Sequence, residues 1–357
     1  MRAVTYNGPR DVRVEELPDP KIEAPEDAVL RVTMSGICAA DVEMYYRQGL
    51  DFIHLGTVLG HEYVGVVEEV GRGVTRIRKG DHVIGSPYPS CGACPECREK
   101  LTSHCRGTGR AALGSTLSGA HAERMRVPFA DHTLERVPAD LTDEQVICVG
   151  DAFSTALHHA SLGGDLTGKP AAVLGLGLAG LLGVMALRTL GADPVIAIDV
   201  IPGRLERAKG LGAEPLHAGT ERVGRVLRER TEGRGVAFLL ETTADVQAVG
   251  LGLGGLRAGG ALVLGGTYTE DRLPVPSAAH WKSLRIFTGV ASTREWNRLA
   301  LQWIAAGRID LAPFVTDTLP LSDAPGGFLR MDRSPLHGFT ENYNPVAESC
   351  LKVVLKP

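Results

Sequence analysis

The apolar positions of the chain are densest between residues 171 and 199, where their spacing changes twice. Residues 171–177, AAVLGLG, form a continuous apolar run that ends in glycines, as buried strands of parallel sheets do. The next residues, LLGVMALRTLGA, are mostly apolar over the length of a helix, and PVIAID is a second short apolar run. This order predicts a strand, a helix and a second buried strand.

The segments before this unit alternate apolar and polar residues instead. Within residues 1–35, RAVTYN, DVRVEEL and AVLRVTMSG alternate in the way of half-buried strands, and prolines separate them. Residues 58–74 and 79–85 are again rich in strand-forming residues. These patterns predict an irregular β-barrel in the N-terminal half, whereas residues 225–266 return to the strand-and-helix pattern and supply later units of the parallel sheet.

A glycine turn joins the first predicted strand of the parallel sheet to its helix. Gly175, Gly177 and Gly180 form G-x-G-x-x-G, and Asp199 ends the second strand, which is the spacing of a dinucleotide-binding βαβ unit. Two glycines let the backbone approach a pyrophosphate, the third packs helix on strand, and the helix N-terminus faces the anion. The alternative is a plain parallel-sheet turn whose glycines serve packing alone.

Asp199 indicates which dinucleotide this turn takes. Its carboxylate would accept hydrogen bonds from the adenosine ribose and repel a 2′-phosphate, which favours NAD over NADP. Arg204 would offset that repulsion, although an arginine at the start of the next helix is as easily a solvated residue. The predicted cofactor-binding residues of this segment are Gly175, Gly177, Leu178, Ala179, Gly180, Asp199 and Arg204.

Length and charge narrow the class of protein. A chain of 357 residues is long for one core and favours two domains. The net charge of -4 and the lack of a basic block argue against nucleic acid as a partner. The sequence has no uncharged apolar run long enough to span a membrane and no signal-peptide pattern at its start, so we expect a cytoplasmic protein.

Seven cysteines in a reducing compartment are expected to be thiols or metal ligands rather than disulfides. Four of them, Cys91, Cys94, Cys97 and Cys105, lie within residues 91–105, with turn-forming glycine and proline between them. Closely spaced thiols can converge on one zinc ion, and four cysteine ligands leave no position open for a substrate. The sequence therefore predicts a structural zinc lobe, and the alternative is four incidental free thiols.

A second metal site is indicated upstream. Cys38 follows a glycine turn, and His61 directly precedes Glu62. Taken alone, each is equally well explained by burial, because cysteine is among the most buried residue types. A catalytic zinc takes three protein ligands and leaves a fourth position open, so Cys38, His61 and a downstream carboxylate would make such a set. The residue types alone leave the third ligand undecided.

Several segments together resemble the zinc-containing medium-chain alcohol dehydrogenases, over nearly the whole chain. GICAAD is similar to the family's Gly-x-Cys-Gly-Thr-Asp segment, GHEYVGVVEEVG to its Gly-His-Glu segment and KGDHV to its Gly-Asp-Arg-Val turn. CGACPECREKLTSHC and GLGLAG resemble the structural-zinc lobe and the nucleotide turn. The resemblance implies an α/β fold. An irregular GroES-like β-barrel catalytic domain (residues 1–155 and 300–357) would accompany a doubly wound parallel-sheet (Rossmann) NAD-binding domain (residues 156–299).

The resemblance also assigns the catalytic zinc set by matching position. Cys38, His61 and Asp151 would be the ligands, with Asp151 standing where family members carry Cys, Asp or Glu. Glu62 matches a glutamate that enters the coordination sphere during turnover. Asp41 matches an aspartate that orients the histidine ligand, and such partners fix the tautomer and raise the basicity of the ligand.

Outside the metal set, the resemblance assigns two cofactor residues and exposes one departure. Thr155 matches a residue beside the nicotinamide, and Lys352 matches a basic residue on the cofactor pyrophosphate. The hydroxyl residue that usually starts the proton relay is replaced by Ala40, which carries no proton. Glu43, Tyr45 or a water would have to substitute for it, or the reaction needs no relay.

Together these features predict an NAD-dependent zinc alcohol dehydrogenase that transfers a hydride between NAD(H) and an alcohol/ketone pair, with a secondary or cyclic alcohol as substrate. We expect two zinc ions per chain and a homodimer or homotetramer. The missing relay hydroxyl leaves open a reductase of C=N or conjugated C=C bonds that uses NADH or NADPH; a catalytically silent NAD-binding protein is the other alternative. Residues 325–345 are polar and turn-rich, and a surface loop, an oligomer contact or part of the substrate cleft all fit them.

Overall fold

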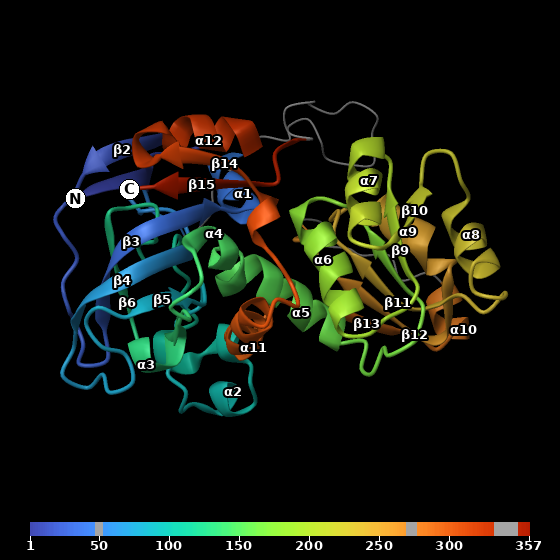
Figure 1. Ribbon diagram of the computed structural model, residues 1–357, viewed down its shortest axis with the longest axis horizontal. Helices are drawn as coiled ribbons and strands as arrows, with labels where there is room; N and C mark the ends of the chain where they lie inside the picture. The colour runs from blue at the N-terminus through green and yellow to red at the C-terminus, as the bar shows by residue number, and fades with distance from the viewer. Residues whose placement is uncertain (47–52, 269–276, 332–348) are drawn as a thin grey trace. The chain divides into compact units, whose positions relative to one another are not determined.

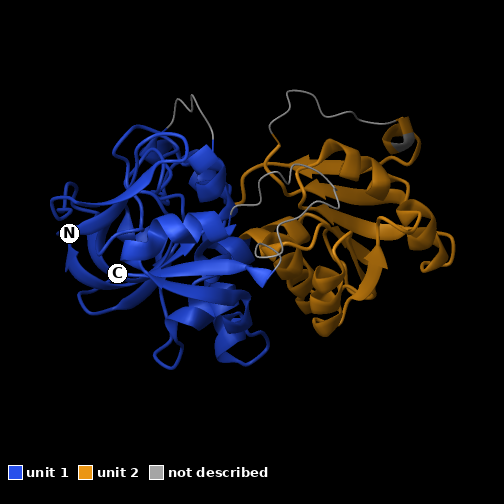
Figure 2. Cartoon of the chain, turned by 90° about the horizontal axis from the view of Figure 1, so that it is seen from above, with its two compact units in different colours: residues 1–154, 292–332, 349–357 blue, residues 155–291, 333–348 orange. Residues whose placement is uncertain are grey.

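The computed structural model of the chain describes residues 1–46, 53–268, 277–331 and 349–357. Contacts between the residues divide the chain into two compact units (Figure 2). Unit 1 comprises Met1–Ser154, Ser292–Asp332 and Ser349–Pro357, and Thr155–Ala291 belong to unit 2. Within the described residues, unit 2 is therefore one continuous segment of sequence between two parts of unit 1.

Unit 1 is built mainly on antiparallel strands. One sheet of the described residues has the order β14-β15-β3-β4-β5-β7, with β6 also paired to β3, and β1 pairs with β2 separately. The strands are β1 (Arg2–Tyr6), β2 (Val12–Glu16), β3 (Ala28–Ile37), β4 (Glu62–Val70), β5 (His82–Gly85), β6 (Arg124–Val127), β7 (Leu134–Arg136), β14 (Val315–Pro320) and β15 (Lys352–Lys356). Strand β3 is the centre of this unit because it pairs with β4, β6 and β15, and its register sets Gly36 opposite Glu62.

Short helices connect and cover these strands. The helices of unit 1 are α1 (Ala39–Tyr46), α2 (Pro95–Arg98), α3 (Ala130–Thr133), α4 (Asp143–Val146), α11 (Arg294–Ala305) and α12 (Ala324–Met331). Single turns of 3₁₀-helix are η1 (Thr102–His104), η2 (Arg106–Thr108), η4 (Ala312–Phe314) and η5 (Leu321–Asp323), and η3 (Val149–Phe153) is a π-helix. Connecting segments of this kind commonly carry binding and catalytic side chains, because the strands hold them in place.

The segment of residues 325–345 begins with a helix and not with the turns that its composition suggested. Helix α12 continues to Met331, and residues 332–345 lie outside the described residues. Phe328 and Met331 are buried against Ile37 and Val353, in one apolar cluster. Burial of these two side chains on one helical face decides the conformation here, because two glycines and a proline by themselves favour a turn.

Unit 2 is a parallel sheet of the order β10-β9-β8-β11-β12-β13. Its strands are β8 (Ala171–Leu174), β9 (Val195–Asp199), β10 (Glu214–His217), β11 (Val236–Glu241), β12 (Leu256–Leu264) and β13 (Arg285–Thr288). Its helices are α5 (Ser154–Ser161), α6 (Leu178–Thr189), α7 (Pro202–Gly210), α8 (Val223–Glu229), α9 (Val246–Leu253) and α10 (Ser277–Trp281). The order reverses between β8 and β11, which is the topological switch of a doubly wound sheet.

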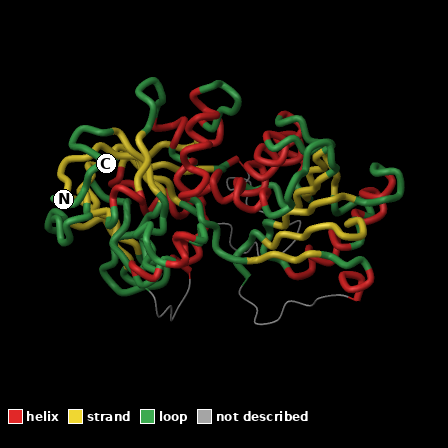
Figure 3. The backbone as a smooth tube through the Cα atoms, turned by 90° about the horizontal axis from the view of Figure 1, so that it is seen from below, coloured by secondary structure: helices red, strands yellow, loops and turns green. Residues whose placement is uncertain are grey.

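The burial of the central strands explains why their sequences are continuous apolar runs. Every residue of β8, β9 and β11 is buried, since helices cover the sheet on both faces. Helices α6 and α7 contact each other, as do α8 and α9, and Figure 3 shows helices along the strands of this unit. The predicted fold class, a β-rich unit with a doubly wound parallel sheet, is confirmed.

Candidate metal and nucleotide sites

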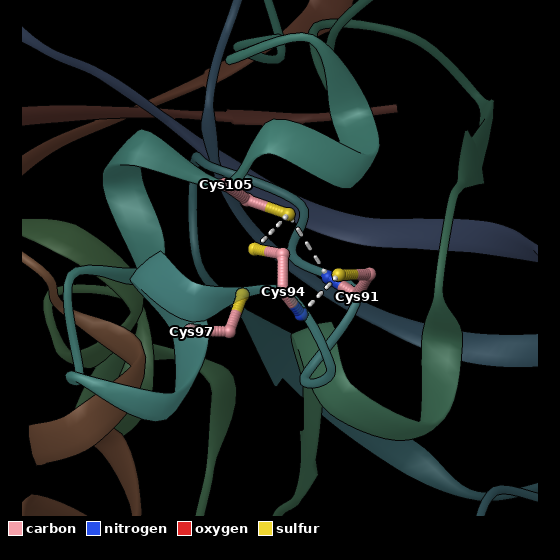
Figure 4. Close-up of side chains that lie close together, drawn as sticks. All are labelled: Cys91, Cys94, Cys97 and Cys105. Carbon is pink, nitrogen blue, oxygen red and sulfur yellow. Dashed lines mark hydrogen bonds between the residues drawn. The ribbon is translucent and has the colours of Figure 1, made fainter.

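The four clustered cysteines of unit 1 converge on one another (Figure 4). The ligand atoms of Cys91, Cys94, Cys97 and Cys105 all lie within 4.8 Å of each other. The Cys94 and Cys105 sulfurs are 3.9 Å apart, and the backbone N–H of Cys91 donates to the Cys105 sulfur at 3.2 Å. A hydrogen bond from the backbone of Cys97 lowers the pKa of the Cys94 thiol to about 6. A thiolate is the form that binds zinc, and the convergence of four cysteine sulfurs fits a tetrahedral zinc ion.

A second group of metal-binding side chains lies at the end of β3. The ligand atoms of Cys38, His61, Glu62 and Asp151 also fall within 4.8 Å of one another. The His61 Nε2 is 3.5 Å from an Asp151 oxygen, and the Cys38 sulfur is 4.0 Å from the same oxygen. Cys38 follows β3 and His61 precedes β4, and the antiparallel pairing of these strands brings them together. Sulfur, nitrogen and carboxylate donors in one place fit zinc.

Asp151 is presented by the π-helix η3. A π-turn leaves backbone groups without their usual helical partners. Asn297 of α11 is fully buried, and its amide, oriented to suit its neighbours, donates to the Val149 oxygen at 3.0 Å and to the Ser154 hydroxyl at 2.8 Å. Asn297 therefore ties both ends of the turn that carries Asp151.

Asp41 contacts both Cys38 and His61. Its carboxylate is fully buried, accepts the backbone N–H of Cys38 at 2.8 Å and lies 3.2 Å from the His61 Nδ1. Burial by itself raises the pKa of Asp41, but the neighbouring imidazoles of His61 and His121 outweigh burial and hold this pKa well below its usual range. Asp41 is thus an anionic acceptor that leaves the Nε2 of His61 free to face the metal set.

Glu62 has a buried partner, Lys352, that the sequence analysis did not connect with it. The Lys352 ammonium lies 2.6 and 2.7 Å from the two Glu62 oxygens and also donates to the Ile37 oxygen. The side chains of Lys352 and Glu62 are 1% and 0% exposed. Burial by itself lowers the pKa of Lys352, but the Glu62 charge outweighs it and raises this pKa. Lys352 is thus enclosed in unit 1 as the countercharge of Glu62, and its contact with the cofactor pyrophosphate stays a prediction.

The predicted nucleotide turn of unit 2 has the geometry that its glycines require. Gly175 has φ +89, and a Cβ on Gly180 would stand 1.8 Å from the Gly175 oxygen. The Thr242 hydroxyl donates to that same oxygen at 2.9 Å. Helix α6 begins at Leu178, directly after Gly177, so its first N–H groups open onto the turn.

Asp199 ends β9 beside this turn and holds it in place. Its carboxylate is 3% exposed and accepts the backbone N–H groups of Leu176, Val200 and Ile201 at 2.6, 2.7 and 2.9 Å. The Arg204 guanidinium lies 3.7 Å from it. Arg204 is thus directed at Asp199, and the alternative of a solvated surface arginine does not hold, because its side chain is 13% exposed.

The remaining predicted residues are not members of the two groups of metal-binding side chains. Thr155 stands in the first turn of α5, in unit 2. Glu43 is partly exposed on α1 and does not belong to the group of four metal-binding side chains. Ala40 is exposed in the first turn of the same helix, and Tyr45 is buried there. The structure therefore leaves the proton route as a prediction.

Three residues near the metal set were missed by the sequence analysis. His121 and Asn297 are buried, and they lie far along the chain from the residues they contact. The third residue is Tyr88, which lies close enough to Asp151 to sense its charge. Burial, with this charge adding to it, raises the pKa of Tyr88 to about 12. One sequence signal for His121 is a polar residue between Ala120 and Ala122, in a stretch of small residues; for Asn297 we find none.

Comparison with known proteins gives relatives along the whole chain. Two family models match: the alcohol dehydrogenase GroES-like domain over residues 24–139 and the zinc-binding dehydrogenase over residues 179–306. Zinc-type alcohol dehydrogenase B of Aspergillus flavus is 32% identical over 92% of this chain and 78% of its own length. The uncharacterized zinc-type alcohol dehydrogenase-like protein AdhB of Bacillus subtilis is 30% identical, with 100% of each chain covered.

A solved structure is similar over the same extent. The alcohol dehydrogenase TADH from Thermus sp. ATN1 matches with a TM-score of 0.90 and 34% identity, and the match covers 100% of this chain and 99% of that one. In the part of the chain that the structure describes, no helix has the length and apolar character to span a membrane.

Proposed function

The chain belongs to the zinc-dependent medium-chain dehydrogenases/reductases, and we propose that within this family it is an NAD-dependent zinc alcohol dehydrogenase. It would transfer a hydride between NAD(H) and an alcohol/ketone pair, with a secondary or cyclic alcohol as substrate. The observation that carries the proposal is the convergence of Cys38, His61 and Asp151 within 4.8 Å in unit 1. Three donors of this kind leave one position of a tetrahedral ion for substrate.

The residues of unit 1 take distinct parts in this proposal. Zinc bound there supplies Lewis-acid polarisation of a hydroxyl or carbonyl oxygen. Cys38, His61 and Asp151 bind the ion, and Asp41 keeps the proton of His61 on Nδ1, so that Nε2 can act as the ligand. Glu62 is a fourth donor within reach, and the charge of its carboxylate is balanced by Lys352. A second zinc ion on Cys91, Cys94, Cys97 and Cys105 would be structural.

The nucleotide turn of unit 2 supports NAD as the cofactor. The N–H groups at the start of α6 offer donors to a pyrophosphate, and Asp199 places a negative charge at the end of β9. That charge would repel a 2′-phosphate, and the contact with Arg204 reduces the repulsion without removing it. We therefore expect a higher kcat/KM with NAD than with NADP, and a smaller difference in Asp199→Ala.

A steady-state assay tests the proposal. Zinc-replete protein is given NAD or NADP with a panel of secondary alcohols, cyclic alcohols and polyols, and formation of the reduced cofactor is followed. We expect turnover with at least one secondary or cyclic alcohol, and its loss in His61→Ala with the fold retained by circular dichroism. Tightly held zinc without turnover on the panel would favour a silent NAD-binding protein, and a preference for NADP would contradict the role given to Asp199.

Ala40 favours a second candidate function, because it replaces the hydroxyl that would start a proton relay. Such a relay contributes a factor of about 10²–10⁴ in rate, and a reaction that needs no relay would not lose this factor. In the first proposal the proton leaves through Glu43 or water, so Glu43→Gln should slow oxidation at neutral pH and change its pH profile. Ala40→Ser should accelerate it. Faster reduction of an imine or enone than of any ketone, with no effect of Ala40→Ser, would instead identify a C=N or C=C reductase.

Two further proposals concern the compartment in which the protein works and its oligomeric state. All seven cysteines are free thiols in the structure, and we propose that the protein works on small molecules in the reducing cytoplasm. We also propose a homodimer or homotetramer, which sedimentation of the zinc-replete protein measures. A monomer at micromolar concentration would contradict this.

A further inference from the structure

A buried polar chain continues behind Asp41, away from the metal set. His121 stands just before β6 and is fully buried, with its Nε2 3.7 Å from an Asp41 oxygen. Its Nδ1 lies 2.9 Å from the hydroxyl of Ser35 on β3. The order of contacts is therefore Ser35, His121, Asp41 and His61, all within unit 1.

Two buried atoms of this chain make no hydrogen bond within the described residues. They are the His121 Nε2, which lies 3.7 Å from the Asp41 Oδ2, and the Asp41 Oδ1, which lies 3.2 Å from the His61 Nδ1. A neutral imidazole has one N–H and one acceptor nitrogen, and the partner at one nitrogen decides which is which. If the Ser35 hydroxyl donates to Nδ1, the N–H of His121 is on Nε2 and is directed at Asp41. Burial makes an unpaired N–H costly, so this orientation favours contact with the carboxylate.

The segment that carries His121 also fixes the residue before His61. The backbone N–H of His121 donates to the Leu59 oxygen at 2.8 Å, and that of Ala120 donates to the Gly60 oxygen at 2.8 Å. Gly60 has φ +93, and a Cβ there would lie 2.4 Å from the His121 Nδ1. A side chain at position 60 would collide with the His121 imidazole, so only glycine lets this ring pack against the residue before His61.

We propose that His121 is a positioning residue for the metal set: its Nε2–H fixes the Asp41 carboxylate, which in turn holds the Cys38 backbone and the His61 ring. This inference rests on the proposed function, because it takes Cys38, His61 and Asp151 as the zinc ligands. Removal of such an outer partner commonly costs a factor of about 10–100 in metal affinity. If His121 served only to pack against the ring of Phe328, it would not matter which of its two nitrogens faces Asp41.

Three variants separate the two nitrogens from the ring. His121→Gln places an amide N–H toward Asp41, His121→Asn keeps a polar group near Ser35 but not near Asp41, and His121→Phe keeps only the ring. Zinc-loaded wild-type and variant proteins are titrated with a chelator, and zinc per chain is counted. Cobalt-substituted proteins are compared by visible absorption, which reports the geometry of the ligands and does not depend on turnover.

We expect about 10–100-fold weaker retention of one zinc ion in His121→Phe and His121→Asn, with a changed cobalt spectrum. His121→Gln should stay within a few fold of wild type. The control is His82→Phe, which removes another imidazole–carboxylate contact of unit 1, to Asp143 at 2.8 Å, and should hold both ions.

Wild-type retention and an unchanged spectrum in His121→Phe would overturn the inference and leave the proposed function standing. Equal loss in His121→Gln and His121→Phe would also overturn it, because the N–H toward Asp41 would not matter. A wild-type protein that holds no ion on Cys38 and His61 would overturn the proposed function, and the inference with it.

Discussion

At the scale of single residues, the Lys352–Glu62 pair shows how burial changes what an ion pair means. Both side chains are enclosed, and the ammonium has both carboxylate oxygens as partners. Removal of water costs each charge several kcal/mol, so the pair adds little stability as a whole, but either member without the other is expensive. A cation beside a metal-binding carboxylate also lowers the total negative charge around the ion.

We predict that Lys352→Met lowers the free energy of unfolding by about 3–5 kcal/mol, because it leaves Glu62 buried and unpaired. Lys352→Met combined with Glu62→Leu should recover much of this loss. Urea unfolding of the single and double variants measures both effects. The control is Lys356→Met on the same strand, whose ion pair with Glu144 is half exposed and should cost at most about 1 kcal/mol. Equal effects at the two lysines would contradict the prediction.

A pH-dependent term in stability is predicted for His132, which packs under the cysteine lobe against Gly92. Burial, with the charge of Arg294 adding to it, lowers the pKa of His132 to about 4, whereas an unfolded histidine titrates near 6.5. Between these values the unfolded chain binds a proton that the folded chain does not. The contribution of neutral His132 to the free energy of unfolding is therefore complete above about pH 6.5. It decreases as the pH is lowered toward about 4.

The measurement is the free energy of unfolding of wild type minus that of His132→Asn across this pH range. The difference should decrease as the pH falls from about 6.5 to about 4 and level off below. His104→Asn, at an exposed position of the same lobe, is the control and should show no such slope. A flat difference for His132 would mean that its imidazole does not stay neutral in the folded protein.

At the scale of elements, the π-helix η3 carries the candidate ligand Asp151. Helix α5 follows it without a break, so the extra residue of the π-turn rotates Asp151 relative to a regular helix. The neighbouring helix α11 supplies Asn297, whose amide satisfies the Val149 oxygen. The conformation of this short element thus depends on a helix that is distant in sequence.

We predict that Asn297→Leu destabilises the protein by about 1–3 kcal/mol, because the Val149 oxygen loses its donor in a buried position. It should also weaken zinc retention at Cys38, His61 and Asp151, since η3 relaxes. Unfolding and zinc counting on the same preparation check both. Gln302→Leu, an exposed change on the same helix, is the control. Loss of stability with unchanged zinc retention would show that Asn297 supports the core and not Asp151.

At the scale of the whole molecule, unit 1 contains both candidate metal sets and unit 2 contains the nucleotide turn. We predict two zinc ions per chain, measured by metal analysis after zinc-replete purification. Cys97→Ser should leave one ion and lower the melting temperature, because structural zinc binding is coupled to folding. His61→Ala should also leave one ion but retain most of the stability.

Cys148 provides the control for this series, as a buried cysteine outside both groups. Cys148→Ala should keep two ions. One ion or fewer in the wild-type protein would contradict the two-site interpretation, and loss of both ions in Cys97→Ser would show that the two sites are not independent.

The sequence by itself determined the features whose causes are local. The strand, glycine turn and helix of residues 171–199 are continuous in the chain, and their apolar spacing and φ requirements are set by neighbouring residues. The cysteine lobe is equally local, since its four thiols come from residues 91–105. The fold class followed from these patterns together with the family resemblance.

Tertiary structure decided what depends on burial and on contacts between distant segments. Lys352 pairs with Glu62 across 290 positions of sequence, and His121 meets Ser35 across 86. A buried charge takes whatever countercharge the fold brings within reach, and a buried N–H takes whatever acceptor it faces. Residue spacing carries no record of such partners. Only the packing of β3, β4 and β15 placed Lys352 against a candidate metal ligand, because it enclosed both charges together.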